Sequence, residues 1–250
     1  MDAAIVIPAR YASSRLPAKP LLKSTGKFLI QHVYERCCRS KRARLVIVAT
    51  DDTRIAAAVE SFGGNIVMTR SDHRSGTDRV AEVAADLEVD VIVNVQGDEP
   101  EIEPDALDQL IETLAQEPET EMATLAVPIQ SLDQWRDPNC VKVVCDSRGQ
   151  ALYFSRSPIP YVRDAQPDFA ARPARFLQHL GVYAYHRDFL LRLAKMAQDP
   201  IEEMEKLEQL RVLASGHTIR VGLVRGAQIG VDTLDQYEAF VQRFQLARAA

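Results

Sequence analysis

The sequence lacks the features that mark several classes of protein. It holds only four cysteines in 250 residues, and their spacing matches neither a disulfide framework nor a zinc site. No stretch approaches the roughly 18 consecutive apolar residues of a membrane span. The N-terminal segment carries an acid where a signal peptide is basic. We therefore expect four reduced thiols, a cytoplasmic location and no membrane partner.

The sequence also lacks an excess of positively charged residues. The chain has 30 Lys and Arg against 35 Asp and Glu, a net charge of −5. Proteins that bind nucleic acids or membrane surfaces in bulk normally carry a basic excess. This balance predicts no nucleic-acid partner, but it leaves room for local basic pockets that hold small anions.

The chain does have enough apolar residues to form a core. It is 46% hydrophobic and 26% charged, and a chain of this length buries roughly 70–75% of the surface that its unfolded form exposes. No linker of convincing composition is visible. We predict a single domain spanning residues 1–250.

Short β-branched runs alternate with helical patterns in the first half of the chain. This alternation predicts an α/β fold with a mostly parallel, twisted sheet and helices on both faces. The ligand site of such a sheet lies beyond the carboxyl ends of its strands. The expected elements are residues 4–7, 29–38, 45–49, 53–62, 65–68, 77–87 and 89–95, followed by a helix that begins after Pro104.

The pattern changes after about residue 120. Three strand-like segments with turn signals between them predict a smaller antiparallel subregion at about residues 120–185. Residues 157–173 contain four prolines, which favours a long surface loop. The expected strands of this half are 122–129, 140–145, 151–154, 177–185 and 218–224, and the expected helices are 187–197, 202–214 and 234–247.

The loop at residues 7–20, after the first predicted strand, carries three cations and three prolines. Arg10, Arg15 and Lys19 can converge on one polyanion such as a triphosphate, because two guanidinium forks and an ammonium suit phosphate oxygens. The chain contains neither GxxxxGK[ST] nor GxGxxG, so the P-loop and dinucleotide-binding interpretations lose their main support. A solvated basic loop is the alternative.

Two carboxylates follow predicted strands in a similar way. Asp98 comes just after an apolar strand, where we expect Gly97 to allow an unusual backbone angle and close approach to a ligand. Asp232 follows a later strand and can supply a second carboxylate. Local backbone capping by Asp98 and helix N-capping by Asp232 are the alternatives.

Five further strings accompany the first loop: residues 75–79 (SGTDR), 94–100 (NVQGDEP), 153–156 (YFSR), 179–183 (HLGVY) and 207–211 (LEQLR). Together they resemble the sugar-nucleotide cytidylyltransferases, specifically the family of 3-deoxy-manno-octulosonate (Kdo) cytidylyltransferases, or CMP-Kdo synthetases. The resemblance runs nearly end to end. Ala18 replaces a usual glycine, and Phe28 and Leu234 replace usual prolines.

The resemblance implies an enzyme, a nucleotidyltransferase, whose single domain transfers CMP from CTP to Kdo. The products are CMP-Kdo and pyrophosphate, and CMP-Kdo serves lipopolysaccharide biosynthesis. It also implies Mg²⁺ as cofactor and a homodimer formed through the antiparallel subregion. No residue is a convincing general base, so the simplest hypothesis is that Asp98 acts through magnesium.

The resemblance also assigns roles to residues. Without it, Glu208 and Gln209 would be a solvated helix face, His179 a packed core histidine, and Ser75 or Thr77 a helix cap. The implied catalytic residues are Arg10, Arg15, Lys19 and Asp98, and the implied metal ligands are Asp98 and Asp232. The implied nucleotide-binding residues are Pro8, Ala9, Arg10, Arg15, Lys19, Arg70, His73, Ser75, Gly76, Thr77 and Gln96. The implied sugar-binding residues are Gln96, Arg156, His179, Tyr183, Glu208 and Gln209.

Two other functions stay open from the sequence. One is a cytidylyltransferase for a related acid sugar, such as 8-amino-Kdo or a sialic acid. The other is a non-catalytic nucleotide-binding module that kept the fold, which would require the loss of a metal carboxylate, and both Asp98 and Asp232 are present.

Overall fold

A computed structural model describes residues 1–12, 16–117, 119–226 and 230–249. The chain forms two compact units, Met1–Asp108 with Gln228–Ala250, and Gln109–Ala227. Within the described ranges, no helix is both long enough and apolar enough to cross a bilayer. All four cysteines are free thiols.

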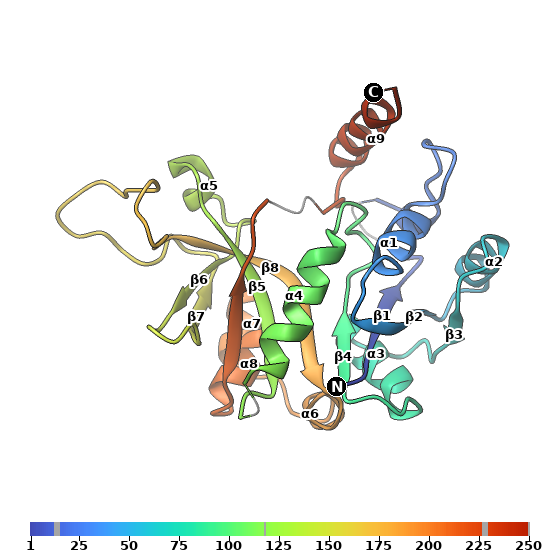
Figure 1. The fold of residues 1–250 in the computed structure, drawn as a ribbon, viewed down its shortest axis with the longest axis horizontal. Helices are drawn as coiled ribbons and strands as arrows, with labels where there is room; N and C mark the ends of the chain where they lie inside the picture. Colours follow the sequence, from blue (N-terminus) through green and yellow to red (C-terminus); the bar gives the residue numbers. More distant parts are fainter. Residues whose placement is uncertain (13–15, 118, 227–229, 250) are drawn as a thin grey trace. The chain divides into compact units, whose positions relative to one another are not determined.

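The first unit is built on a parallel sheet with the strand order β3-β2-β1-β4 (Figure 1). Strand β1 pairs with β2 from Ala3–Ala43 to Ala9–Thr50 and with β4 on its other side. Every residue of β1 is buried, as expected for a parallel strand covered on both faces. The strands are β1 (Ala3–Ala9), β2 (Ala43–Thr50), β3 (Ile66–Met68) and β4 (Val91–Asn94).

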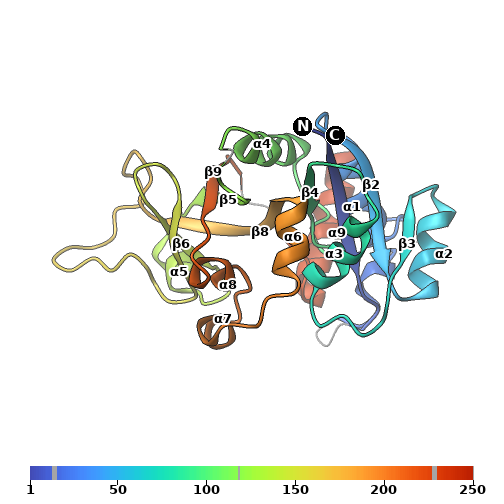
Figure 2. The same cartoon turned by 90° about the horizontal axis from the view of Figure 1, so that it is seen from below.

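Helices connect these strands in the βαβ manner. Asp52 caps α2 by accepting a hydrogen bond from the Arg54 amide, and Ser75 caps α3 through the Asp78 amide. Because βαβ crossovers are right-handed, α1 and α2 cover one face of the sheet and α3 covers the other. Figures 1 and 2 both show α2 beside β3. The helices are η1 (Lys19–Leu21, a 3-10 turn), α1 (Leu29–Cys37), α2 (Thr53–Ser61), α3 (Gly76–Ala85) and α9 (Leu234–Ala249), and α4 (Pro104–Ala115) begins in this unit.

The second unit contains the antiparallel part of the fold. Strand β5 pairs antiparallel with β8, and β6 pairs antiparallel with both β7 and β8. These pairings confirm the antiparallel subregion predicted at about residues 120–185. Strand β5 also pairs parallel with β9, which lies outside that range. The strands are β5 (Met122–Pro128), β6 (Lys142–Cys145), β7 (Ala151–Ser155), β8 (Leu177–His186) and β9 (Ile219–Leu223); the helices are α5 (Leu132–Arg136), α6 (Arg187–Leu193), α7 (Pro200–Glu205) and α8 (Gln209–Ala214).

The pairing confirms the predicted fold class, an α/β fold with a mostly parallel sheet and a smaller antiparallel part.

The long loop between β7 and β8 is also confirmed, and Figures 1 and 2 both show it extended. Its base is anchored, because Trp135 donates its indole N–H to the carbonyl of Ile159 at 3.1 Å. Phe169 and Val162 pack on the cluster of Trp135 and Phe176.

The helix expected over residues 202–214 is two helices. Lys206 adopts a left-handed conformation with φ 53° and ends α7, and Glu208 is the N-cap of α8. The apolar spacing continues across this break, so periodicity alone could not reveal it. A buried ion pair joins the two helices, with both Arg211–Glu202 hydrogen bonds at 2.7 Å.

His32 lies where α1 meets α9. Its Nε2 is 2.7 Å from the Thr25 hydroxyl, and its ring meets Phe240 and Phe244 edge-on at 5.1 and 4.7 Å between centroids. Burial, followed by the positive charge of Lys27, lowers the pKa of His32 from 6.5 to about 4. The imidazole is therefore neutral in the folded protein at neutral pH.

This shift predicts a pH dependence of stability. Between pH 6.5 and 4 the unfolded chain binds a proton at His32 that the folded protein does not, so the contribution of His32 to stability falls as the pH falls. We expect His32→Leu to lose less unfolding free energy than the wild type between pH 7.5 and 5, by about 1 kcal/mol after solvent screening. Urea unfolding at both pH values measures this difference, and equal losses in the two proteins would contradict it.

Candidate functional site

A cavity of about 420 Å³ lies at the carboxyl ends of β1 and β4 in the first unit. Four segments line it: the end of β1 with its loop, the start of α3, the turn after β4, and residue 232. This position is the one that the α/β rule predicts for a ligand. The lining residues are Pro8, Ala9, Arg10, Ala12, Lys19, Pro20, Arg74, Ser75, Gly76, Gln96, Gly97, Asp98 and Asp232.

Two glycines let these segments approach one another. A Cβ on Gly97 would lie 3.1 Å from the carbonyl oxygen of Pro8, and one on Gly76 would lie 3.3 Å from Pro8 Cγ. Gly97 is not among the residues with positive φ, so the expected unusual backbone angle was wrong. The glycine is required because the turn after β4 packs against the backbone of β1.

The ammonium of Lys19 bridges two carboxylates that are distant in sequence. It donates to Asp98 Oδ2 at 2.6 Å and to Asp232 Oδ1 at 3.1 Å, and the Lys19 side chain is only 12% exposed. The Asp98 carbonyl also accepts from the Val231 amide at 2.8 Å. The structure therefore brings together three of the predicted residues, Lys19, Asp98 and Asp232.

Asp232 is not the N-cap of α9. Thr233 accepts a hydrogen bond from the Gln236 amide at 3.3 Å, and the Gln236 side chain accepts from the Thr233 amide at 3.1 Å. This reciprocal pair caps the helix. The capping interpretation of Asp232 was wrong, and its carboxylate faces Lys19 instead.

Glu99 is a residue of this cluster that the sequence interpretation missed. Burial, with the charges of Asp98 and Asp232 added to it, raises the pKa of Glu99 to about 8. Its Oε2 is buried and has no hydrogen-bond partner among the described residues. The acid doublet at residues 98–99 was the available signal.

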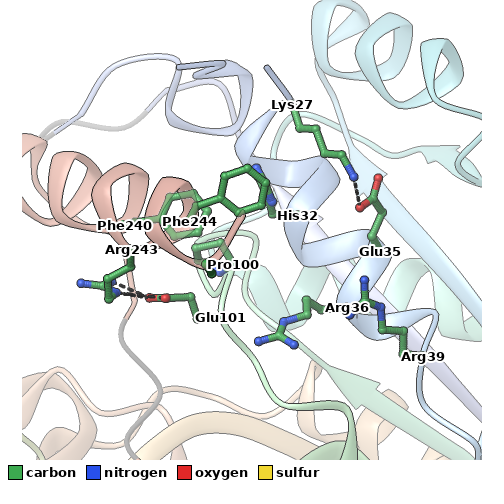
Figure 3. Close-up of a pocket in the computed structure, with 11 residues that line it drawn as sticks. Lys27, His32, Glu35, Arg36, Arg39, Pro100, Glu101, Phe240, Arg243 and Phe244 are labelled. Carbon is green, nitrogen blue, oxygen red and sulfur yellow. Dashed lines mark hydrogen bonds and ion pairs between the residues drawn. The ribbon is translucent and has the colours of Figure 1, made fainter. Parts of the chain in front are cut away.

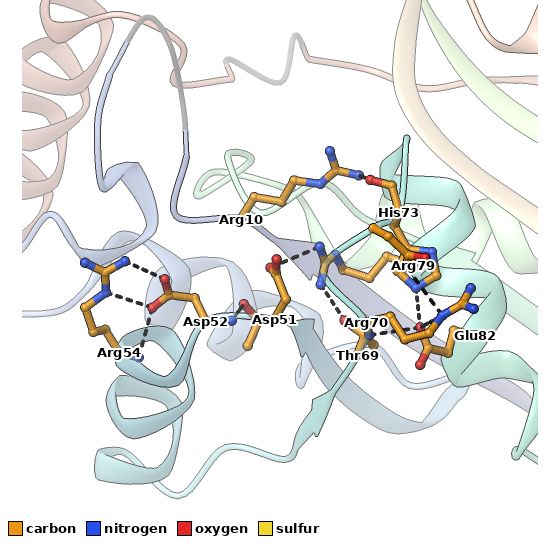
Figure 4. A network of polar contacts seen from close by, with 11 residues as sticks. Arg10, Asp51, Asp52, Arg54, Thr69, Arg70, His73, Arg79 and Glu82 are labelled. Carbon is orange, nitrogen blue, oxygen red and sulfur yellow. Dashed lines mark hydrogen bonds and ion pairs between the residues drawn. The ribbon is translucent and has the colours of Figure 1, made fainter.

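Arg10 is held by the segment before α3 (Figure 4). Its Nη2 donates to the His73 carbonyl at 3.0 Å. The His73 ring is hydrogen-bonded to Glu82, whose carboxylate also accepts from the Arg70 amide at 3.2 Å. Burial alone would raise the pKa of Glu82, but the hydrogen bonds from His73 and Arg70 lower it. His73 and Arg70 thus support Arg10 and are not among the residues that line the cavity.

Arg79 anchors the neighbouring strand ends. Its guanidinium is 1% exposed, pairs with Asp51 at 3.0 Å and donates to the Thr69 hydroxyl (Figure 4). Asp51 follows β2 and Thr69 follows β3. One buried cation therefore ties together two loops on the side of the sheet where Arg10 lies, and the sequence interpretation did not single it out.

Ser75 and Thr77 have different surroundings. Ser75 caps α3 and lines the cavity. Thr77 is buried, and its hydroxyl accepts from Asn94, whose side-chain oxygen accepts from Gln96 at 3.0 Å. Thr77 therefore orients Gln96 from behind, and it does not line the cavity. Arg15 lies outside the described residues.

Three of the predicted sugar-binding residues, His179, Tyr183 and Gln209, contact one another in the second unit. The rings of His179 and Tyr183 are 5.4 Å apart, and the Tyr183 hydroxyl donates to Gln209 Oε1 at 3.2 Å. Burial lowers the pKa of His179 to about 3 and raises that of Tyr183, so both are neutral. Gln209 Nε2 is buried and has no hydrogen-bond partner among the described residues.

Arg156 has a different set of contacts. Its guanidinium donates to the carbonyls of Glu205 at 2.7 Å and Pro138 at 3.0 Å. The buried ammonium of Lys142 donates to the Arg156 carbonyl at 2.6 Å. These bonds hold Arg156 rigidly at the end of β7. Glu208 is the N-cap of α8, next to Gln209.

The fold and the cluster of cations and carboxylates define a nucleotidyltransferase, and the chain belongs to the cytidylyltransferase family, whose model matches residues 4–219. It is 50% identical over 236 residues to the 3-deoxy-manno-octulosonate cytidylyltransferase of Syntrophotalea carbinolica, with 93% of this chain and 94% of the relative covered. It is 51% identical over 239 residues to that of Syntrophobacter fumaroxidans, with 94% of each chain covered.

A solved structure supports this assignment. A CMP:2-keto-3-deoxy-manno-octonic acid synthetase complexed with CTP matches the whole of both chains, with a TM-score of 0.91 and 46% identity. A 4-diphosphocytidyl-2C-methyl-D-erythritol synthase from Anaerococcus prevotii matches with a TM-score of 0.62 and 14% identity, over 98% of each chain. The second match shows a shared fold only.

Ala18 generates a prediction about the first loop. It has φ 55°, in the left-handed region, where a Cβ is strained and glycine is not. We expect Ala18→Gly to raise the free energy of unfolding by about 0.5–1 kcal/mol, because relief of strain exceeds the added entropy of the unfolded chain. Ala57→Gly, at an exposed position in α2, is the matched control and should lower stability by about 1 kcal/mol. A loss of stability in both variants, measured by urea unfolding, would refute the strain.

Proposed function

We propose that this chain transfers CMP from CTP to Kdo, giving CMP-Kdo and pyrophosphate, and so activates Kdo for lipopolysaccharide biosynthesis. The observation that carries the proposal is the convergence of Lys19, Asp98 and Asp232 at the carboxyl ends of the parallel strands. Relatives about half identical over nearly the whole chain, and the match to a synthetase complexed with CTP, support it.

The carboxylate cluster fits a magnesium ion as cofactor. Asp98 and Asp232 already converge on one cation, the Lys19 ammonium, and Glu99 adds a buried oxygen without a partner. Mg²⁺ needs only one or two carboxylates beside phosphate oxygens and waters, although no cluster of three potential ligands occurs in the part of the chain that the structure describes. Asp98 and Asp232 would hold the ion, which when bound neutralises phosphate charge.

The cations of the first loop serve the triphosphate. Lys19 and Arg10 line the cavity. We assign to them, and to Arg15, the neutralisation of the phosphates and of the departing pyrophosphate. Attack on the α-phosphorus then needs the sugar hydroxyl held in line, and no covalent step on the protein.

We divide the residues assigned to the nucleotide into two sets, those that line the cavity and those that support the lining residues. Pro8, Ala9, Ser75, Gly76 and Gln96 line the cavity, and we assign them direct contact with the nucleotide. Thr77 supports Gln96 from behind through Asn94, and His73 and Arg70, which both bond to Glu82, support Arg10.

In the second unit we assign sugar binding to His179, Tyr183 and Gln209, together with Glu208 and Arg156. The family resemblance assigns a sugar contact to Gln96 of the first unit as well. The unpartnered amide of Gln209 is a donor that a sugar oxygen would satisfy, which removes the cost of burying it. Arg156 supplies the cation that a sugar carboxylate requires. The neutral imidazole of His179 supplies a further polar group.

We also propose that residues 1–250 act as one cytoplasmic nucleotidyltransferase domain that forms a homodimer through residues 120–185. The family model matches residues from both compact units continuously. Within residues 120–185, Leu152 is 60% exposed and Tyr161 is 81% exposed. Large apolar side chains in such positions suit a partner surface, and sedimentation of a monomer at micromolar concentration would refute the dimer.

A pyrophosphate-release assay tests the function. Release is expected only when CTP, Mg²⁺ and the sugar are all present, with Kdo preferred to 8-amino-Kdo and sialic acid. Faster release with another sugar would reassign the substrate. Binding of CTP without any pyrophosphate release would identify a non-catalytic module.

Asp98→Asn tests the carboxylate cluster. We expect turnover to fall by roughly 10²-fold or more, because the amide cannot hold a cation against the phosphates. CTP binding, measured by calorimetry, should be largely unchanged. Asp86→Asn, at an exposed position after α3, is the matched control and should keep full turnover. Unchanged turnover in Asp98→Asn would eliminate the proposed role.

Glu82→Gln tests the support behind Arg10. Loss of the charged acceptor loosens the segment whose carbonyl holds Arg10, so we expect the KM for CTP to rise about tenfold. The kcat at saturating CTP and the KM for Kdo should stay within about twofold. Glu60→Gln, on the exposed face of α2, is the control. A fall in kcat without a change in the KM for CTP would show that Glu82 does not position Arg10.

A further inference from the structure

A second cavity, of about 330 Å³, lies in the first unit between α1, α9 and the turn at Pro100 and Glu101 (Figure 3). It shares no lining residue with the cavity at the ends of β1 and β4. The proposed reaction uses none of its side chains. The cavity therefore requires its own explanation.

One side of this cavity is aromatic and weakly polar. Phe240 and Phe244 of α9 lie beside His32 and Pro100 (Figure 3). The His32 ring meets both phenylalanines edge-on, at 5.1 and 4.7 Å between centroids. This imidazole is uncharged at neutral pH because burial lowers its pKa to about 4. A planar ring can pack against such a surface.

The rim of the cavity carries an excess of cations. Lys27 pairs with Glu35 at 2.5 Å, and Arg243 donates to Glu101 through Nε at 3.0 Å and through Nη2 at 2.5 Å. Within each of these two pairs the positive and negative charges cancel (Figure 3). The positive charge that remains comes from Arg36 of α1 and from Arg39, which follows the end of that helix.

Arg36 and Arg39 supply that remaining charge. Arg36 pairs with Glu103 at 3.1 Å, but Glu103 is more than half exposed and is not a lining residue. The Arg39 side chain makes no ion pair with any residue in the described ranges. Four cations and two carboxylates thus line the cavity, and two guanidinium forks are available to a carboxylate or phosphate.

We propose that this cavity is a binding site for a small organic anion that joins a flat ring to a phosphate or carboxylate. The ring packs on Phe244 and His32, and the anionic group takes Arg39 and Arg36. A simple inorganic anion leaves the aromatic side uncovered, and a neutral ring leaves the guanidinium groups without an anion. An occupant also touches Pro100 and Glu101, which follow Asp98 in the same turn.

Calorimetric titration of the full-length protein with phenyl phosphate tests the site. We expect saturable binding of one equivalent, with inorganic phosphate and phenol each binding at least about tenfold more weakly. Arg39→Ala should weaken phenyl phosphate about tenfold. Arg39 is exposed, so this variant should fold as the wild type does, and circular dichroism checks that.

Arg10→Ala is the matched control, because Arg10 lines only the other cavity. It should leave the affinity for phenyl phosphate unchanged. Absence of saturable binding at tens of millimolar would overturn the proposal. So would weakening by Arg10→Ala with none by Arg39→Ala, because the probe would then occupy the other cavity. Neither result bears on the proposed transfer of CMP, which the pyrophosphate assay tests.

Discussion

The ammonium of Lys19 holds Asp98 and Asp232 on one side of the sheet, and the rest of the candidate site depends on that contact. The carboxylates of Asp98 and Asp232 would repel one another without a cation between them, and burial beside them raises the pKa of Glu99. Lys19 comes from the loop after β1, Asp98 from the turn after β4, and Asp232 from the segment before α9. One cation therefore joins three segments that are far apart in the sequence. The same arrangement suits a reaction in which phosphates and a divalent ion enter and leave the site.

Support for the site comes from polar groups behind it. Glu82 holds His73 and the Arg70 amide, and the His73 carbonyl holds Arg10. Thr77 acts on Gln96 through Asn94 in the same way. Hydrogen bonds to charged groups in partly buried positions are stronger than exposed ones. The side chains that face the cavity are therefore held before a ligand arrives, which reduces the entropy lost on binding.

Much of the fold could be predicted because its cause is local. Strand β1 is apolar at every position, and α2 and α3 begin at capping residues that can be recognised in the sequence. The break between α7 and α8 could not be predicted in this way, because Met204 and Leu207 keep the helical spacing across the left-handed Lys206. The unusual backbone angle expected at Gly97 was wrong, and the structure shows instead a close contact with Pro8, which is distant in sequence.

The sequence by itself determined the α/β class, the cationic loop after the first strand and the family to which the chain belongs, because each depends on residue type and order. Only the tertiary structure decided which side chains face the cavity and which support it. Thr233 rather than Asp232 caps α9. Thr77 and His73 were predicted to bind the nucleotide, but they lie behind residues that line the cavity. Side-chain direction depends on the backbone around each residue and on partners from other elements. Neither is visible in the spacing of residues along a chain.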